Sequence, residues 1–234
     1  MTGGFTNSGR ITGESGNGVS ITAPNWGAAD ARADIVNTLN GVIAGGATGF
    51  SLNATNVYGD FLNDATISGD GPDTGVHLTA VLFDGDFTNN GAITSAYNAL
   101  RLDFTTFDGA FSNTGTIAGG SNGAILTLGS MTSGFTNSGR ITGESGNGVS
   151  ITATNWGSAD ARADIVNTLS GEITGGVTGF SLNATNVYGD FLNDGSISGD
   201  GENTGAHLTA TLFDGNFTNN GAITSAYNAL RLTF

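Results

Sequence analysis

The chain of 234 residues contains no cysteine and no lysine, so its six basic residues are all arginine. Without cysteine, neither a disulfide bond nor a thiolate metal site can form. The six arginines stand against 20 acidic residues, and the net charge of −14 repels the phosphates of nucleic acids and anionic lipid headgroups. We therefore expect no nucleic acid among its partners.

Long apolar runs are also missing, because no stretch approaches the roughly 18 residues that cross a bilayer. Residues 1–30 lack the basic and then apolar pattern of a secretory signal. We expect no direct membrane insertion in this segment and place any export signal or anchor outside it. Proline occurs only twice, whereas 40 residues are glycine, a density that disfavours helices and favours turns.

The sequence repeats on two scales. Residues 131–234 copy residues 1–104 at an offset of 130, with 89 of 104 positions identical, and both chain ends fall inside this repeat, which suggests a longer parent protein. A finer period of 24–30 residues lies within it and indicates a solenoid, a propeller or an array. Its units, which we call coils, begin with Phe-x-Asn or Ile-x-Asn at nine positions: Phe5, Ile35, Phe61, Phe87, Phe111, Phe135, Ile165, Phe191 and Phe217.

Further columns follow each start. An Ile recurs in all nine coils, from Ile11 to Ile223, and an alternating apolar pair such as Val19 and Ile21 closes each coil. Alternation in short runs bounded by Gly, Asn and Asp predicts β-strands. The position two residues after each start is always asparagine: Asn7, Asn37, Asn63, Asn89, Asn113, Asn137, Asn167, Asn193 and Asn219.

One coil cannot fold alone. Burial of its roughly four large apolar side chains contributes about 6–12 kcal/mol, whereas ordering about 26 residues costs about 1–2 kcal/mol each. Stacked coils pair each strand with its equivalents above and below. The sequence therefore predicts an all-β fold, a parallel β-solenoid of about nine coils that is continuous over residues 1–234, with a five-coil unit at 1–130 and a truncated four-coil unit at 131–234.

The asparagine column carries the sharpest structural prediction. Strand alternation puts each Asn on the same side as the inward Phe or Ile two residues earlier. A buried amide needs partners for its donors and its acceptor, and identical amides at the strand spacing can bond one to the next. We predict such a ladder. A simple turn preference of Asn is the alternative, but it would also tolerate Asp, Ser or Gly.

The stretches FTNSGRITGESGNGVSI, FTNNGAITSAYNALRL and FSNTGTIAGGSNGAILTL resemble the right-handed parallel β-helix repeats of bacterial autotransporter passenger domains and related large surface adhesins. The likeness spans all nine coils, and its motif is structural and shared by surface proteins of differing function. It implies a right-handed coil, an extracellular or cell-surface location and a structural or adhesive role. The membrane-embedded barrel and the signal peptide of that family are not in the sequence.

Catalysis needs a unique constellation, yet almost every polar residue recurs at the offset of 130 or along a column, and we find no polar cluster confined to one copy. His77 and His207 share one outward position without a second His or Cys nearby, which favours solvated surface residues over a zinc or catalytic role. No G-x-S-x-G nucleophile motif is present. We expect no enzyme, no catalytic residue and no cofactor site.

Acidic residues precede the inward Phe or Ile in several coils: Asp34, Asp60, Asp86, Asp164 and Asp190. Such a column can share calcium, a hard cation that prefers carboxylates. The alternative is a solvated acidic ridge, because unit charges about 5 Å apart in water repel by only about 0.8 kcal/mol. Asn216 takes the place of Asp in the last coil and weakens the ligand set.

The longest connections are TAPNWGAADARAD at 22–34 and its copy TATNWGSADARAD at 152–164. Insertions in solenoids map to one face and often bind. We therefore expect both loops to protrude, with candidate partner-binding residues Trp26, Arg32, Trp156 and Arg162. In the alternative, each Trp folds back and covers the side of its coil.

An outward column of small residues follows the inward Ile: Thr12, Ala44, Ser68, Thr94, Ala118, Thr142, Thr174, Ser198 and Thr224. Flat threonine arrays on solenoids can match an ice lattice, but Ala breaks this column and no second Thr column stands beside it.

These features favour a structural or adhesive stalk or fibre segment outside a bacterial cell. It would extend a binding element and present its duplicated loops to other copies of itself or to a host or matrix surface. Unpaired β-edges at both ends promote end-to-end association. A polysaccharide-binding or polysaccharide-cleaving module on the same scaffold is the first alternative, and an ice-binding solenoid is the second.

Overall fold

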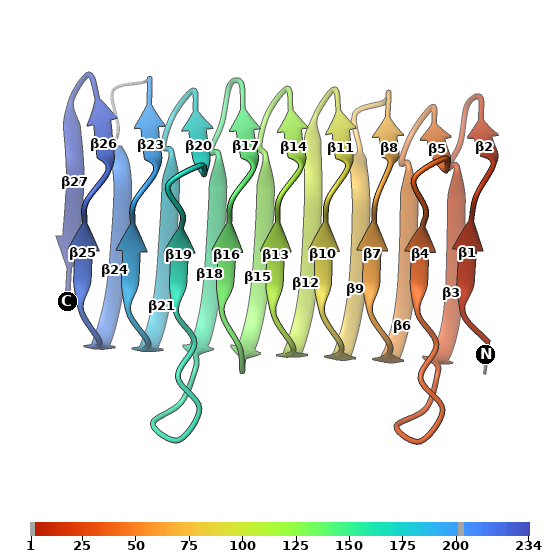
Figure 1. Cartoon of the computed structure of the whole chain (residues 1–234), viewed down its shortest axis with the longest axis horizontal. Helices are drawn as coiled ribbons and strands as arrows, with labels where there is room; N and C mark the ends of the chain where they lie inside the picture. Colours follow the sequence, from red (N-terminus) through yellow and green to blue (C-terminus); the bar gives the residue numbers. More distant parts are fainter. Residues whose placement is uncertain (1–2, 201–203) are drawn as a thin grey trace.

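The computed structural model describes residues 3–200 and 204–234 and contains 27 β-strands in three parallel sheets of nine strands each. Every coil gives one strand to each sheet, so nine coils stack along one axis (Figure 1). The predicted all-β solenoid is confirmed. The described residues form no helix, and hence none long and apolar enough to span a bilayer. At about 4.8 Å per coil, the rod is roughly 40 Å long.

The three strands of a coil follow one another in the sequence. Sheet 1 contains β1 (Phe5–Asn7), β4 (Ile35–Asn37), β7 (Phe61–Asn63), β10 (Phe87–Asn89), β13 (Phe111–Asn113), β16 (Phe135–Asn137), β19 (Ile165–Asn167), β22 (Phe191–Asn193) and β25 (Phe217–Asn219). Sheet 2 contains β2 (Arg10–Gly13), β5 (Val42–Gly45), β8 (Thr66–Gly69), β11 (Ala92–Ser95), β14 (Thr116–Gly119), β17 (Arg140–Gly143), β20 (Glu172–Gly175), β23 (Ser196–Gly199) and β26 (Ala222–Ser225). Sheet 3 contains β3 (Val19–Trp26), β6 (Phe50–Tyr58), β9 (Thr74–Asp84), β12 (Asn98–Asp108), β15 (Ala124–Met131), β18 (Val149–Trp156), β21 (Phe180–Tyr188), β24 (Thr204–Asp214) and β27 (Asn228–Thr233).

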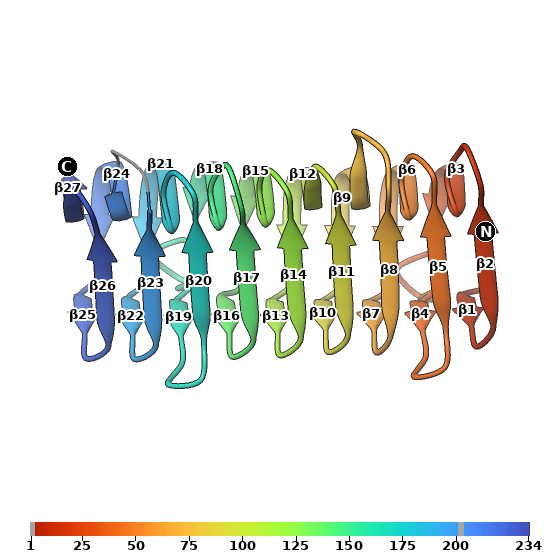
Figure 2. The ribbon, with the colours of Figure 1, turned by 90° about the horizontal axis from the view of Figure 1, so that it is seen from above.

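The path of the chain is right-handed. In Figure 1 it rises through sheets 1 and 2 on the near side and descends through sheet 3 on the far side, while each coil lies to the left of the one before. Parallel strands joined by crossovers take this hand almost without exception. Seen from above in Figure 2, sheet 2 crosses from sheet 1 to sheet 3, so the sheets form three sides of each coil.

Sequence columns become spatial columns because the register is fixed. Phe5 pairs with Ile35 and Asn7 with Asn37 in sheet 1, and Ile11 pairs with Ile43 in sheet 2. A shift by one residue would turn every inward apolar side chain to the outside. Each coil therefore adds one layer of inward side chains to a continuous core.

Aromatic rings fill much of this core. Four rings stack with centroids 4.6–5.3 Å apart and planes within 6° of parallel: Phe61, Phe87, Phe111 and Phe135. Where sheet 1 has the smaller Ile35, sheet 3 supplies Phe50, whose ring packs edge-on between those of Phe5 and Phe61. Ile165 and Phe180 repeat this exchange in the second copy. Core volume is thus conserved from coil to coil, as close packing requires.

Sheet 3 is longer than the apolar pairs predicted, with strands of up to 11 residues in β9 and β12. One further inward column carries mostly alanine, as at Ala80, and another carries large side chains, as at Phe83. Alternate residues face the same side of a strand. The spacing of three between Ala80 and Phe83 therefore interrupts the alternation near the end of β9, and we infer a bend of the strand there.

Two loops protrude from the lower edge of the rod in Figure 1: residues 27–34 between β3 and β4, and residues 157–164 between β18 and β19. Each begins at a glycine in the left-handed region, Gly27 with φ of 71° and Gly157 with φ of 70°. A side chain would be strained there and would also collide with the carbonyl of Tyr58 or Tyr188.

Candidate functional site

The nine asparagines form one continuous column, in which the first eight are buried and Asn219 of the last coil is exposed. The Nδ2 group of each of the first eight donates a hydrogen bond to Oδ1 of the asparagine in the next coil, through eight successive bonds of 2.7–2.9 Å. The amides of Asn63, Asn89 and Asn113 are fully buried. The structure thus contains an amide ladder that joins all nine coils.

Each ladder amide also closes a turn. Nδ2 of Asn89 donates to the carbonyl of Gly91 at 3.2 Å and lies 3.2 Å from the carbonyl of Thr116 in the next coil. These bonds satisfy the backbone where the chain passes from sheet 1 to sheet 2. Ladder and turn are therefore one arrangement, which explains why no other residue type replaces Asn at these positions.

The candidate calcium ligands serve the backbone. Oδ1 of Asp34 accepts the N–H of Asp60, and Oδ1 of Asp60 accepts the N–H of Asp86, both at 3.0 Å. Asp86, Asp164 and Asp190 accept the corresponding N–H of their next coils in the same way. Among the described residues, no three His, Cys, Asp or Glu side chains gather in a group that could hold a metal ion. The calcium hypothesis therefore finds no ligand cluster in this part of the chain.

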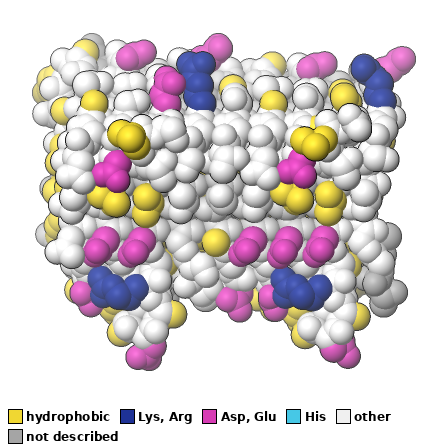
Figure 3. Space-filling model, in the orientation of Figure 1, with side chains coloured by type: hydrophobic (Ala, Val, Ile, Leu, Met, Phe, Trp, Pro, Cys, Tyr) yellow, Lys and Arg dark blue, Asp and Glu magenta, His cyan; other side chains and the backbone are white. Residues whose placement is uncertain are grey.

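Both candidate arginines are held by acidic side chains of later coils. Arg32 lies 2.7 Å from Asp84 Oδ1 and 3.4 Å from Asp60 Oδ1, and the hydrogen bond to Asp84 raises the pKa of the guanidinium. Arg162 makes the equivalent pairs at 3.5 and 3.8 Å with Asp214 and Asp190. Figure 3 shows two basic patches on the lower part of this face, each beside acidic side chains. Such exposed pairs stabilise a fold only slightly.

Of the two interpretations of Trp26 and Trp156, the structure has the one in which each indole folds back over its coil, and neither ring is exposed for partner binding. Their exposed fractions are 1% and 0%, and Nε1 donates to the carbonyl of Ala33 at 2.6 Å in the first loop and of Ala163 at 2.7 Å in the second. Each indole therefore seals the side of its coil under its own loop. The physical reason is that a large apolar ring with one donor gains most where both the ring and the N–H are satisfied.

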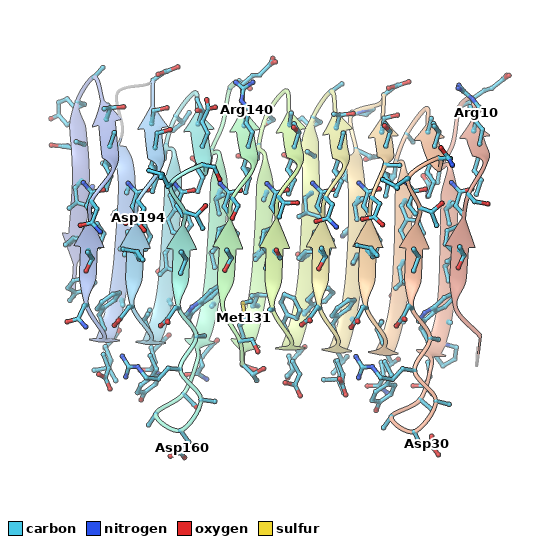
Figure 4. The ribbon with its side chains drawn as sticks, viewed as in Figure 1. Arg10, Asp30, Met131, Arg140, Asp160 and Asp194 are labelled. Atoms are coloured by element: carbon cyan, nitrogen blue, oxygen red, sulfur yellow. The ribbon has the colours of Figure 1, made fainter. Side chains whose placement is uncertain are left out.

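The reachable part of each loop is its tip. Ala28 and Ala31 exchange two backbone hydrogen bonds of 3.0 Å and pinch the first loop into a narrow hairpin. Figure 4 places Asp30 and Asp160 at the two tips. The duplicated loops thus offer a partner a small acidic tip rather than an aromatic surface.

Threonine recurs on the outer side of sheet 3 as well as on sheet 2, and in both places other residues interrupt it. Two outward rows of sheet 3, which include Thr79 and Thr105, lie on either side of the inward alanine column. They line two hollows of about 710 and 550 Å³ that meet at Thr127. On sheet 2 the single predicted column runs from Thr12 to Thr224. Neither arrangement is the flat double array that the ice-binding alternative needs.

His77 belongs to a polar cluster that sequence reasoning missed. Its Nε2 lies 3.0 Å from Asp103 Oδ2, and Arg101 Nε donates to the same oxygen at 2.7 Å. Partial burial raises the pKa of Asp103, but the hydrogen bonds from His77 and Arg101 outweigh it and lower this pKa below its ordinary value. The carboxylate therefore holds the imidazole and the guanidinium in fixed positions.

The second copy lacks this carboxylate, because Thr233 stands where the first copy has Asp103. Within the described residues, the hydrogen-bond partner of His207 is Thr209 Oγ1, at 3.2 Å. Burial lowers the pKa of His207, and the charge of Arg231 lowers it further. The expectation that no polar cluster is confined to one copy is therefore wrong, and a comparison of positions 103 and 233 would have revealed it.

The chain matches no protein-family model, no curated protein and no solved structure.

Proposed function

We propose that the chain is a rigid rod segment of a bacterial surface protein, which holds a binding element away from the cell or builds a fibre. The continuity of the three nine-stranded sheets carries this proposal, because every coil is bonded to the next on three sides. The amide ladder adds a buried line of hydrogen bonds along the same axis.

Stacking gives the rod its stiffness. Bending it would stretch the parallel ladders of at least one sheet and separate inward layers that are closely packed. Because each coil contacts only its neighbours, the length of the rod is proportional to the number of coils. Duplication of the 130-residue unit therefore lengthens the rod without a new fold.

The outer surface suits a spacer. The two Trp and their Arg neighbours are engaged within the chain. A net charge of −14 disfavours side-by-side contact between copies, which leaves the ends of the rod for association. The resemblance of the repeats to autotransporter passenger domains and large adhesins supports an extracellular location.

Adhesion would use the repeated features. The loop tips recur at an offset of 130 residues, which is five coils, so they are presented about 24 Å apart along the rod. The outer strands of the first and last coils have unpaired edges that accept a further coil, from the same polypeptide or from another copy. Other copies of the chain and a host or matrix surface are therefore the proposed partners.

Two measurements test this proposal. Antibodies against the folded chain should label intact cells of the source bacterium as strongly as permeabilised ones, with a cytoplasmic protein as the control. Labelling only after permeabilisation would refute the surface role. For the rod, solution scattering of a chain with one added 130-residue unit should show a maximum dimension longer by about 24 Å and an unchanged cross-section. Growth in all dimensions would refute it.

A further inference from the structure

A pocket of about 320 Å³ opens where sheet 2 turns into sheet 3 in the first four coils. This volume lies at the lower end of the range of about 300–1,000 Å³ found for small-molecule sites. The side chains that matter for its chemistry are Asp73, Thr74, His77, Tyr97, Asn98 and Arg101. Thr74, His77, Asn98 and Arg101 lie in β9 and β12 of sheet 3, but the rod proposal assigns no role to their side chains.

Asp103 positions two of these side chains from behind. It engages Nε of Arg101 and Nε2 of His77, and an ionised carboxylate can only accept, so Nε2 carries the proton. The terminal nitrogens of Arg101 and Nδ1 of His77 then have no partner among the described residues. The pocket therefore holds the terminal donors of Arg101 and a ring nitrogen of His77, and Asp103 fixes the orientation of both side chains.

Thr74 supplies an independent observation. Its side chain is 6% exposed, lines the pocket, and has an Oγ1 without a hydrogen-bond partner among the described residues. Buried hydroxyl groups are rarely left in this state. Asn98 is also buried, and its Oδ1 accepts from Asn122 at 2.9 Å, which leaves its Nδ2 group as a donor.

The mixture of groups selects the ligand. Donors on Arg101 and Asn98 and the acceptor carboxylate of Asp73 lie around one small space. A hydroxyl group can both accept from the donors and donate to the carboxylate. The ring of Tyr97 is 48% exposed at this pocket and offers an apolar face. Hydroxyls around an edge and an apolar face are the features of a sugar ring.

Charge decides between kinds of sugar. Arg101 supplies the positive charge of the lining, whereas Asp73 and, behind Arg101, Asp103 supply two negative charges. An acidic sugar would meet the field of a chain with a net charge of −14. We propose that this pocket binds one ring of a neutral glycan, with Tyr97 against the ring face and Arg101, Asp73 and Asn98 on the hydroxyls.

The second copy provides a natural contrast. It has Glu202 for Pro72, Asn203 for Asp73 and Thr233 for Asp103, of which 202 and 203 lie outside the described residues. One site per chain therefore follows. Failure of sugar binding would leave the rod untouched, and an intracellular location would leave the pocket untouched, so the two proposals fail separately.

The test is a titration of the isotope-labelled full chain, followed by NMR, with maltose, cellobiose, lactose and N,N′-diacetylchitobiose as neutral probes. Glucuronic acid and glucosamine serve as the charged probes. At least one neutral probe should shift the signals of His77, Tyr97 and Arg101 in a saturable way. Tyr97→Ala should weaken this binding by about tenfold, whereas Tyr227→Ala should leave it unchanged.

Asp103→Thr installs the residue that the second copy already carries, so the variant should fold and still lose affinity. Three results would overturn the proposal: no saturable shift with any neutral probe, saturation by a charged probe alone, or equal effects of Tyr97→Ala and Tyr227→Ala. Unchanged affinity in Asp103→Thr would likewise overturn the assigned role of the cluster.

Discussion

The fourth and ninth coils share one sequence, from residue 87 to 102 and from 217 to 232, yet they are buried very differently. Leu100 and Leu102 are 0% exposed, whereas Leu230 and Leu232 are 40% exposed. The fourth coil is bonded to a coil on each side, while β27 of the ninth coil pairs only with β24. A coil therefore has no core of its own, and its burial is supplied by its neighbours.

Trp26 is buried although it lies in a terminal coil. It lies in the first coil, which also has a neighbour on one side only, and is still buried, because residues 27–34 fold over it. Because its own loop buries Trp26, we expect its replacement by Ala to cost as much stability as that of Trp156 in an interior coil. A side chain that depends on a neighbouring coil should cost less in the last coil than in an interior one.

Replacement of either indole should have the largest effect. Trp26→Ala and Trp156→Ala should each lower the free energy of unfolding by about 3–5 kcal/mol, because each removes a fully buried ring and its hydrogen bond. Urea denaturation measures both. A mild effect of Trp26→Ala beside a severe one of Trp156→Ala would mean that the loop does not supply the burial.

Leucines of the matched coils come next. Leu102→Ala should lower the free energy of unfolding by about 2–5 kcal/mol through the cavity it leaves. Leu232→Ala, at the same place in the last coil, should change it by less than about 1 kcal/mol. Thermal denaturation compares the two variants directly, and equal losses would contradict the view that burial comes from the next coil.

The ladder gives a third matched pair. Asn89→Ala leaves the buried Oδ1 of Asn113 without its donor, which should lower the free energy of unfolding by about 1–3 kcal/mol. Asn219→Ala, in the last coil, orphans no later amide and should lower it less. Chemical denaturation tests the pair, and a neutral Asn89→Ala would show that the interior amides are not needed.

The smallest effect concerns the histidine of the second copy. Burial holds the pKa of His207 below the ordinary value of 6.5, so the folded state binds this proton less readily than the unfolded state. Its contribution to stability is therefore complete above about pH 6.5 and declines as the pH falls through the lower pKa of the folded state.

Thr233→Asp should raise the pKa of His207, because it places a carboxylate where Asp103 stands beside His77 in the first copy. Ring signals followed by NMR against pH measure this change. If the pKa of His207 stayed the same in Thr233→Asp, the cluster of the first copy would depend on more than the residue at position 103.

Columns could be predicted from the sequence because parallel stacking in register repeats each environment from coil to coil. The ladder from Asn7 to Asn219 needed only the fixed spacing from Phe or Ile to Asn. The bend between Ala80 and Phe83 could not be read in this way, since it breaks the alternation on which strand patterns rest.

The cluster of His77 escaped prediction for a different reason. His77 and His207 share one neighbourhood in the sequence, and the difference lies 26 residues later, at Asp103 and Thr233. A single substitution in a column of equivalent positions leaves the predicted fold unchanged, so it gives no signal of a site. In a solenoid, residues one coil apart are spatial neighbours, so each of the 15 positions at which the copies differ changes the surroundings of residues in the coils above and below.

Hydrogen exchange of the asparagine side chains tests the stacked ladder most directly. The account predicts that the side-chain amide protons of Asn63, Asn89 and Asn113 exchange orders of magnitude more slowly than those of the exposed Asn40 in the same NMR experiment. Exchange of the ladder amides at the rate of Asn40 would contradict it.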